Sequence, residues 1–181
     1  MQLFPQLGKN YFGDFFIGLT ESVETLCQET GMTIDGAIML KTKERKTKSL
    51  SKLKKEAWDI FSLYIRTRDC LKTTGCASWG LCITCGKRYH IKLLQAGHLI
   101  PGRHNSNLFS EEGTHAQCYN CNINLKGNTL EYRRAIIRLY GEGADERLEA
   151  EARPVKKYTR SDLMERKELY TQKIRELLKE V

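Results

Sequence analysis

The sequence lacks a long apolar run. Its most apolar stretch near the N-terminus, "YFGDFFIGL", is short and is interrupted by Asp14. This stretch is too short to span a membrane, and it is not preceded by the basic leader of a signal peptide. These absences argue against a membrane protein and against an exported one. We therefore expect a protein of the reducing cytoplasm.

Internal repeats are also missing, and so is any low-complexity tract apart from one basic stretch. The 181 residues are enough for one ordinary hydrophobic core. With 40% hydrophobic and 29% charged residues, the composition is that of a globular chain. A solenoid or other repeat architecture is therefore not expected.

Acidic residues are too few to balance the basic ones, which leaves a net charge of +8. Such an excess suggests a polyanionic partner, first of all nucleic acid, although many basic proteins are merely soluble. Residues 41–55, "KTKERKTKSLSKLKK", hold eight Lys or Arg against one Glu and end with Lys54 and Lys55. The stretch has no apolar periodicity until Leu53, so its first part is predicted to be a flexible or weakly helical linker, which is either a DNA-contacting arm or a solvated connector. We expect a domain boundary here, with a helical segment and linker at 1–48 and a second domain at 49–181.

Hydrophobic periodicity predicts the main elements of the second domain. Apolar residues at helical spacing predict a helix from Leu53 to near Asp69. The segment 89–100 reads as a strand or hairpin, and helices return after Cys121, the first ending at Gly141. A last helix is expected near Asp162, which has capping-box spacing with Glu165.

Seven cysteines are present, an odd number that does not suit a disulfide framework in a reducing compartment. Four of them form two C-x2-C pairs, Cys82 with Cys85 and Cys118 with Cys121. Four thiolates make the closed tetrahedral shell of a structural zinc site. Cys27, Cys70 and Cys76 have no partner at ligand spacing and are expected to be free. The pairs therefore predict a structural Zn2+ with no open coordination position.

Between the two cysteine pairs, the segment 95–117 contains three histidines, His98, His104 and His115, while His90 precedes it and is expected to be a surface or strand residue. A single histidine is more often structural than catalytic, but three inside one zinc loop shift that balance. His98 is singled out because it ends a predicted strand, just before a Pro-Gly turn.

The motifs "CITCG", "AGH", "RHN", "QCYNCN" and "GN" resemble the HNH-type ββα-metal nucleases, and in particular the NinG/Rap family of phage recombination proteins. The similarity covers about residues 53–180. The layout also resembles the phage resolvase endonuclease VII. The resemblance implies an α+β fold, with a small zinc-stabilised ββα-metal (HNH/His-Me finger) core at about residues 80–128 flanked by helices. It also implies the host cell cytoplasm as the location.

Carried over by motif, the resemblance makes His98 the general base and Asn122 a ligand of a catalytic Mg2+ or Mn2+. Two positions depart from the pattern of many HNH nucleases, because Gly97 stands where a metal-binding Asp precedes the base and Gly113 stands where an Asn is expected. His115 is then the most plausible substitute ligand. Glu111, Glu112 and His104 are the next candidates.

Several basic residues are candidates for contacts with DNA phosphates. Arg103 and His104 lie in the "RHN" motif, and Arg133 and Arg134 lie on a predicted helix. Together with Lys54 and Lys55 they would form a continuous basic surface. The alternative for each of them is a solvated side chain.

The resemblance predicts a metal-dependent DNA endonuclease of phage recombination, acting on branched DNA such as Holliday junctions or D-loops. A non-catalytic zinc-knuckle protein that binds DNA as a recombination mediator is the alternative, and a zinc scaffold for protein partners is a third. Two symmetric cuts need two sites, so a resolvase favours a homodimer. Residues 162–181 are either its interface or part of the core. Other phage recombination proteins are further expected partners.

Overall fold

The computed structural model describes residue 33 and residues 48–100 and 105–179. The chain divides into two units, Met1–Lys48 and Ser49–Val181, and all the elements named below belong to the second. The predicted N-terminal helix and most of the basic linker lie outside the described residues. None of the described helices is both long and apolar enough to cross a membrane.

The longest described helix is α3, Leu50–Thr74. It begins after Ser49, whose hydroxyl accepts a hydrogen bond from the Lys52 N–H, and ends at Gly75 in the left-handed conformation. The predicted helix is therefore confirmed and is longer at both ends. The helix begins at Leu50, three residues before the predicted start at Leu53, because Ser49 caps it.

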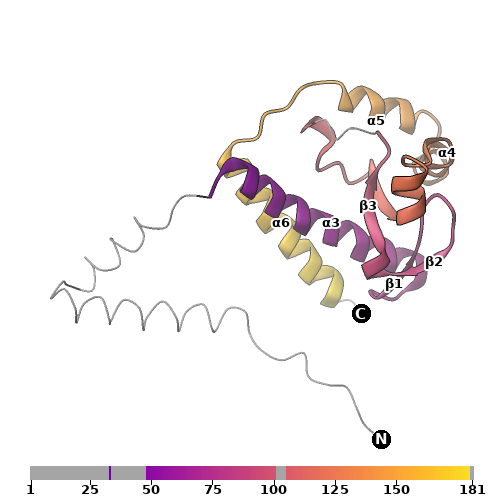
Figure 1. The fold of residues 1–181 in the computed structure, drawn as a ribbon, viewed down its shortest axis with the longest axis horizontal. Coiled ribbons are helices and arrows are strands. Elements are labelled where there is room, and N and C mark those ends of the chain that lie inside the picture. Colours follow the sequence, from indigo (N-terminus) through magenta and orange to yellow (C-terminus); the bar gives the residue numbers. More distant parts are fainter. Residues whose placement is uncertain (1–32, 34–47, 101–104, 180–181) are drawn as a thin grey trace, which may run out of the picture. The chain divides into compact units, whose positions relative to one another are not determined.

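Helix α6, Arg160–Lys179, lies alongside α3 (Figure 1). The two helices share a core rich in aromatic rings, in which the Phe61 and Tyr170 ring centroids are 4.7 Å apart. Leu163 and Tyr170 of α6 are almost completely buried. Of the two roles considered for this segment, the structure shows the core role.

The start of α6 corrects one detail of the sequence analysis. The Thr159 N–H donates to the Asp162 carboxylate at 2.8 Å, and the Asp162 N–H donates to the Thr159 hydroxyl. The capping box therefore joins Thr159 and Asp162 rather than Asp162 and Glu165. A threonine cap three residues upstream satisfies the free N–H groups of the first turn, so the helix begins earlier.

The strands form two small antiparallel sheets. Strand β1, Trp79–Leu81, pairs with β2, Arg88–His90, and β3, Leu94–His98, pairs with β4, Thr114–Cys118. A 3-10 turn, η1 (Ile91–Leu93), separates β2 from β3, and another, η2 (Asn105–Asn107), lies between β3 and β4. The predicted strand or hairpin at 89–100 is thus the end of one sheet and the start of the other.

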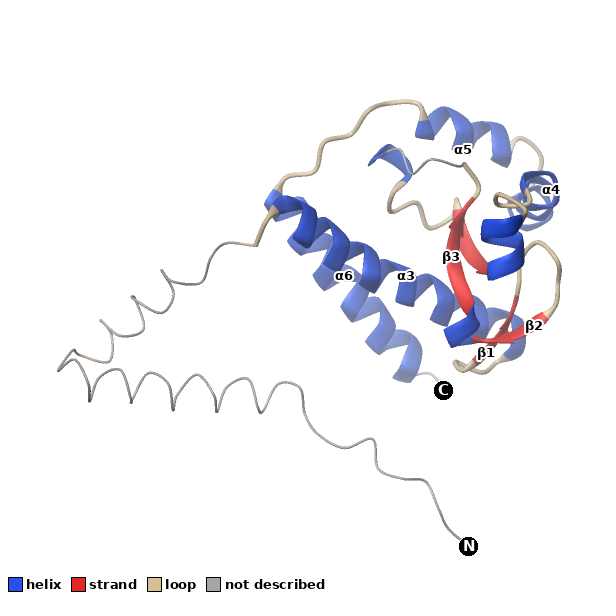
Figure 2. Cartoon of the chain, in the orientation of Figure 1, coloured by secondary structure: helices blue, strands red, loops and turns tan. Residues whose placement is uncertain are grey.

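The elements after β4 complete the domain (Figure 2). A π-helical turn, η3 (Asn120–Asn124), follows β4 directly, and α4 runs over Thr129–Tyr140 and ends at Gly141 as predicted. Helix α5, Ala144–Ala152, was not predicted. Its buried Leu148 joins a second core cluster with residues of α4. The expected α+β class is confirmed.

Candidate functional site

The four predicted cysteines meet at one point. The Sγ atoms of Cys82, Cys85, Cys118 and Cys121 all lie within 4.8 Å of one another, and those of Cys85 and Cys118 are 3.9 Å apart. Tetrahedral zinc with Zn–S bonds of about 2.3 Å places its sulfurs about 3.8 Å apart. Four cysteines in this arrangement could hold a metal such as zinc, which confirms the predicted cluster.

Backbone hydrogen bonds hold the first cysteine pair against the second. The Gly86 N–H donates to the Cys82 carbonyl and closes the turn, where Gly86 has a φ of 68° that favours glycine. The Ile83 N–H donates to the carbonyl of Ala116 in β4 at 2.9 Å. Because β4 ends at Cys118, the turn and the strand bring their thiols together.

His98 is the last residue of β3, as the sequence predicted. Its ring stacks on the indole of Trp58 in α3, with centroids 5.0 Å apart and planes 17° from parallel. Its Nε2 atom is 3.3 Å from the Leu108 carbonyl oxygen. The side chain is partly exposed, so its ring is held in place but can still be reached from solvent.

Asn122 lies in η3, beside β3. Its Nδ2 donates to Gln95 Oε1 at 2.7 Å, and its Oδ1 lies 3.0 Å from the point that a Cβ on Gly97 would occupy. Gly97 is the residue directly before His98. The structure therefore brings Asn122 to the end of β3, where His98 lies, although successive strand residues face opposite sides of the hairpin.

Gly97 occupies a place where a side chain does not fit. An added Cβ would lie 2.0 Å from Gln117 Oε1, and real Cβ atoms essentially never approach another atom closer than 3.0 Å. Helix α4 also packs here, because the buried Tyr132 hydroxyl donates to the Gly97 carbonyl at 2.7 Å. In this arrangement the Gln117 side chain excludes the Asp that many HNH nucleases have before the base.

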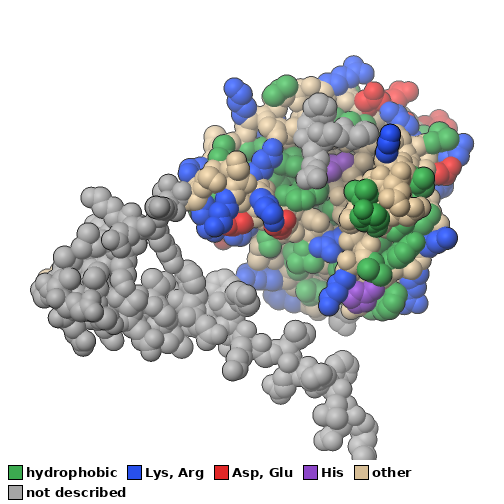
Figure 3. All heavy atoms as spheres, in the orientation of Figure 1, with side chains coloured by type: hydrophobic (Ala, Val, Ile, Leu, Met, Phe, Trp, Pro, Cys, Tyr) green, Lys and Arg blue, Asp and Glu red, His purple; other side chains and the backbone are tan. Residues whose placement is uncertain are grey.

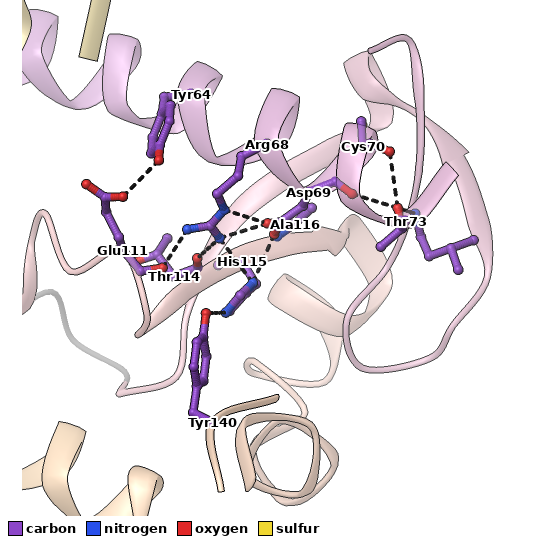
Figure 4. Close-up of polar contacts among 12 residues, drawn as sticks. Tyr64, Arg68, Asp69, Cys70, Thr73, Glu111, Thr114, His115, Ala116 and Tyr140 are labelled. Atoms are coloured by element: carbon purple, nitrogen blue, oxygen red, sulfur yellow. Dashed lines mark hydrogen bonds and ion pairs between the residues drawn. The ribbon is translucent and has the colours of Figure 1, made fainter. Parts of the chain in front are cut away.

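His115 lies on β4, directly opposite Gly97, but its ring has other partners (Figure 4). Nδ1 is 3.0 Å from Asp69 Oδ2, and Nε2 is 3.2 Å from the Tyr140 hydroxyl. The side chain is only 5% exposed. Both ring nitrogens are thus engaged within the protein, in a cluster that also contains Arg68.

Asp69 is the centre of this cluster and is itself buried. Burial raises the pKa of its carboxyl, but the hydrogen bond with His115, the charge of Arg68 and the Ala116 N–H together hold the pKa below its usual value. The carboxylate therefore stays ionised at neutral pH. It links α3 to β4, the second strand of the hairpin whose first strand ends with His98.

Three residues that contribute to this region were missed by the sequence analysis: Arg68, Asp69 and Gln117. The first two were counted only as the end of a helix. Gln117 could have been found, because it lies two residues after His115 on the same face of a predicted strand and directly before Cys118.

Comparison with known protein families assigns the chain to one of them. Residues 32–180 match the family described as Bacteriophage Lambda NinG protein. The chain belongs to the NinG family. No curated protein and no solved structure gives a significant match.

The second departure of this NinG-family chain, Gly113, lies just before β4. Its carbonyl accepts a hydrogen bond from the Leu99 N–H at 2.8 Å, which extends the hairpin one residue beyond His98. A Cβ at Gly113 would lie 2.9 Å from the Ser110 hydroxyl oxygen. Backbone pairing and close packing are therefore the observed roles of Gly113.

The other candidate ligands of the NinG-family chain have separate partners. Glu111 accepts hydrogen bonds from the Tyr64 hydroxyl and from Lys173. Glu112 pairs with Arg147. His104 lies outside the described residues. Both described carboxylates are thus engaged by other side chains of the protein.

Two of the candidate DNA contacts lie on α4, where both arginines are paired within the protein. Arg133 donates to Asp145 at 3.0 Å and to Glu149 at 2.7 Å, and Arg134 pairs with Glu131. The pairing raises the pKa of Arg133, so its charge is retained but partly neutralised by its neighbours. A role in DNA binding stays a prediction for both.

The remaining candidates lie near the start of α3 and in the β3–β4 connection. Lys54 donates to Asn105 Oδ1 at 2.6 Å, and the exposed Lys55 pairs with Asp59. Arg103 and His104 lie outside the described residues. Figure 3 shows Lys and Arg side chains scattered over one face of the described part rather than gathered in a single stripe. Contacts of these residues with DNA likewise stay predictions.

Proposed function

We infer that this recombination-related phage protein is a metal-dependent DNA endonuclease with an HNH-like centre, in which the four cysteines hold a structural zinc. One observation carries the proposal: His98 ends the first strand of a hairpin, and Asn122 in the helical turn after the second strand reaches the adjacent Gly97. The cysteine cluster joins the same strand and turn. The order of strand, strand and helical turn, with His98 and Asn122 at these places, supports an HNH-like centre.

The contacts of His98 suit a general base. A carbonyl oxygen can only accept, so the contact with Leu108 places the proton of a neutral ring on Nε2 and the lone pair on Nδ1. Stacking on Trp58 restrains the plane of the ring. A neutral histidine held in this way takes a proton from the water that attacks the phosphodiester.

Asn122 supplies a neutral amide oxygen of the kind that Mg2+ and Mn2+ bind. Its Nδ2 group donates to Gln95, and its Oδ1 atom lies beside Gly97. Such a cation, when bound, neutralises charge that develops on the phosphate and on the leaving oxygen. The amide oxygens of Gln117 and Asn122 both lie beside Gly97, and oxygen donors of this kind suit a small divalent cation.

Branched DNA as the substrate rests on the resemblance to NinG/Rap and endonuclease VII. No described contact distinguishes a four-way junction from a duplex. A homodimer follows from the same argument, because a junction resolvase cuts two strands symmetrically. We also propose that the protein contacts other phage recombination proteins.

The experiment is cleavage of an end-labelled four-way junction and of a matched linear duplex, with Mg2+ or Mn2+ and zinc-loaded protein. His98→Ala should abolish cutting while DNA affinity is retained. His90→Ala is the matched control, because His90 lies on β2, where its ring packs on Trp79 and accepts a hydrogen bond from the Lys92 N–H. Zinc content and thermal unfolding of each variant establish that the fold is intact.

A non-catalytic recombination mediator is the second candidate, and Gly97 and Gly113 favour it because two ligand positions lack side chains. It predicts DNA binding that weakens steeply with salt, with no cutting by the wild type. If the wild type does not cleave DNA and His98→Ala binds DNA as the wild type does, the mediator is supported and the nuclease proposal is contradicted.

A further inference from the structure

The side chain of Gln117 has an unusual environment. Gln117 is completely buried on β4, and its Oε1 is one of three buried side-chain oxygens in the described part of the chain that have no hydrogen-bond partner. Buried polar atoms in folded proteins are nearly always paired, so an unpaired acceptor calls for an explanation. A cation ligand is one such explanation.

The orientation of the Gln117 amide is fixed by its nitrogen. Nε2 donates to the Gly127 carbonyl oxygen at 2.9 Å, and a carbonyl can only accept. A flipped amide would place two acceptors against each other. Oε1 therefore points the other way, toward Gly97, and lies 2.0 Å from the place that a Cβ there would fill.

Asn122 directs its own oxygen to the same place. Its nitrogen is engaged by Gln95, and its Oδ1 is 3.0 Å from the same Cβ point. The two amide oxygens therefore lie less than about 5 Å apart. The nitrogen of each amide donates a hydrogen bond, to Gly127 and to Gln95. Both oxygens lie beside Gly97, which has no Cβ.

Sequence adjacency links this pair to the cysteine cluster. Gln117 directly precedes Cys118, and Asn122 directly follows Cys121. The stretch "QCYNCN" thus holds two thiol ligands between two amide oxygens that converge. One short segment fixes both pairs of donor atoms.

We propose that Gln117 Oε1 and Asn122 Oδ1 together bind the divalent cation, and that Gln117 takes the part of the Asp that Gly97 replaces. This inference rests on the proposed function and names its second metal ligand. Both oxygens are neutral, so the remaining positions are filled by water and by phosphate oxygens of the DNA. His115, whose ring nitrogens contact Asp69 and Tyr140, is not required as a ligand.

The first test is binding of Mn2+ to the zinc-loaded full chain, measured from the electron paramagnetic resonance signal of free Mn2+. Gln117→Met keeps the length of the side chain and removes the oxygen. It should weaken Mn2+ binding at least 10-fold while zinc content is retained. Asn124→Ala is the control, because that exposed amide lies in the same turn and donates to Asn120. Unchanged binding in a folded Gln117→Met variant overturns the proposal.

A double variant moves the proposed cation ligand from residue 117 on β4 to residue 97 on β3. Gln117→Ala removes the atoms that would clash with a side chain at residue 97, and Gly97→Asp then restores a carboxylate there. The backbone at Gly97 is not in the left-handed region, so Asp is allowed. The double variant should recover Mn2+ binding that Gln117→Ala loses, whereas Gly97→Asp alone should fold poorly. Failure of the double variant to recover binding, with zinc retained, contradicts the ligand exchange.

Mn2+ binding and DNA cleavage test the cation site and the nuclease proposal separately. Wild-type protein that binds Mn2+ through Gln117 but cuts no DNA leaves the cation site standing and removes the nuclease. Wild-type protein that cuts DNA while Gln117→Met binds Mn2+ equally well leaves the nuclease standing and removes Gln117 as a ligand.

Discussion

The ring of His98 stacks on the indole of Trp58, 5.0 Å between centroids and 17° from parallel. This contact joins the proposed general base to α3, a helix that contributes no ligand to the cysteine cluster. The base is therefore positioned by a helix as well as by its own strand.

Replacing Trp58 tests this positioning role. Trp58→Leu removes the stacking surface, and a misplaced base costs about 10- to 100-fold in rate. We expect that loss in the single-turnover cleavage rate, with Mn2+ affinity unchanged. The control is Trp79→Leu, which removes a more exposed indole that packs edge-on against His90. Equal rates for the two variants would contradict a role of Trp58 in positioning His98.

Removal of the cysteine-bound metal should unfold the region around it. A structural zinc contributes about 10 kcal/mol to folding, and this chain places its four thiols on a knuckle, a strand end and a helical turn. Cys118→Ser should lose zinc and cooperative thermal unfolding. Cys76→Ser should keep both, because Cys76 is outside the cluster. Zinc content by atomic absorption and a calorimetric scan are the measurements.

Asp69 should be among the most important ionised residues for stability. Asp69→Ala leaves Arg68 and the Ala116 N–H without their buried partner, which costs about 3–5 kcal/mol. Because the folded pKa of Asp69 is lowered, its contribution is complete above the unfolded pKa of about 4 and is lost as pH falls through the folded pKa. Urea unfolding at pH 7 therefore measures all of it.

The exposed pair of Lys55 and Asp59 provides the control for that measurement. Asp59→Ala should change the free energy of unfolding by less than about 1 kcal/mol, since surface ion pairs contribute little. A similar loss in both variants would show that burial of the Asp69 cluster does not matter.

His115 distinguishes a structural from a metal-binding role. With both ring nitrogens in contact with Asp69 and Tyr140, His115→Ala should lower the free energy of unfolding by about 2–3 kcal/mol. Mn2+ affinity should not change. A variant of near wild-type stability that no longer binds Mn2+ would restore His115 as the substitute ligand named from the sequence.

Much of the fold could be predicted because it depends on local patterns. The apolar spacing of α3, the Gly141 stop of α4 and the two cysteine pairs can all be read within a few residues. Helix α5 was missed because, in "ADERLEAEA", Leu148 is the only large apolar residue. It packs through Leu148 and small alanines, which give no strong periodic signal.

The contacts around the site could not be predicted for a different reason. Asp69 and His115 are far apart in the chain, and only the packing of α3 on β4 brings them together. The role of Gln117 depends on strand register, which sets it diagonally to Gly97. Residue types at motif spacing predicted the cysteine cluster and made His98 and Asn122 candidates, whereas partners set by tertiary packing carry no signal in one sequence.

The adjacency of Gln117 to Cys118 and of Asn122 to Cys121 has a consequence for control of the protein. Any event that releases the thiols, such as oxidation or a shortage of zinc, also separates the two amide oxygens. In the proposed arrangement, the affinity for Mg2+ or Mn2+ would therefore depend on whether zinc occupies the cysteine cluster. By thermodynamic linkage, the affinity for zinc would depend on the divalent cation to the same extent. The proposed nuclease would therefore need both metals for activity, and oxidation of the thiols would inactivate it without modifying His98 or either amide.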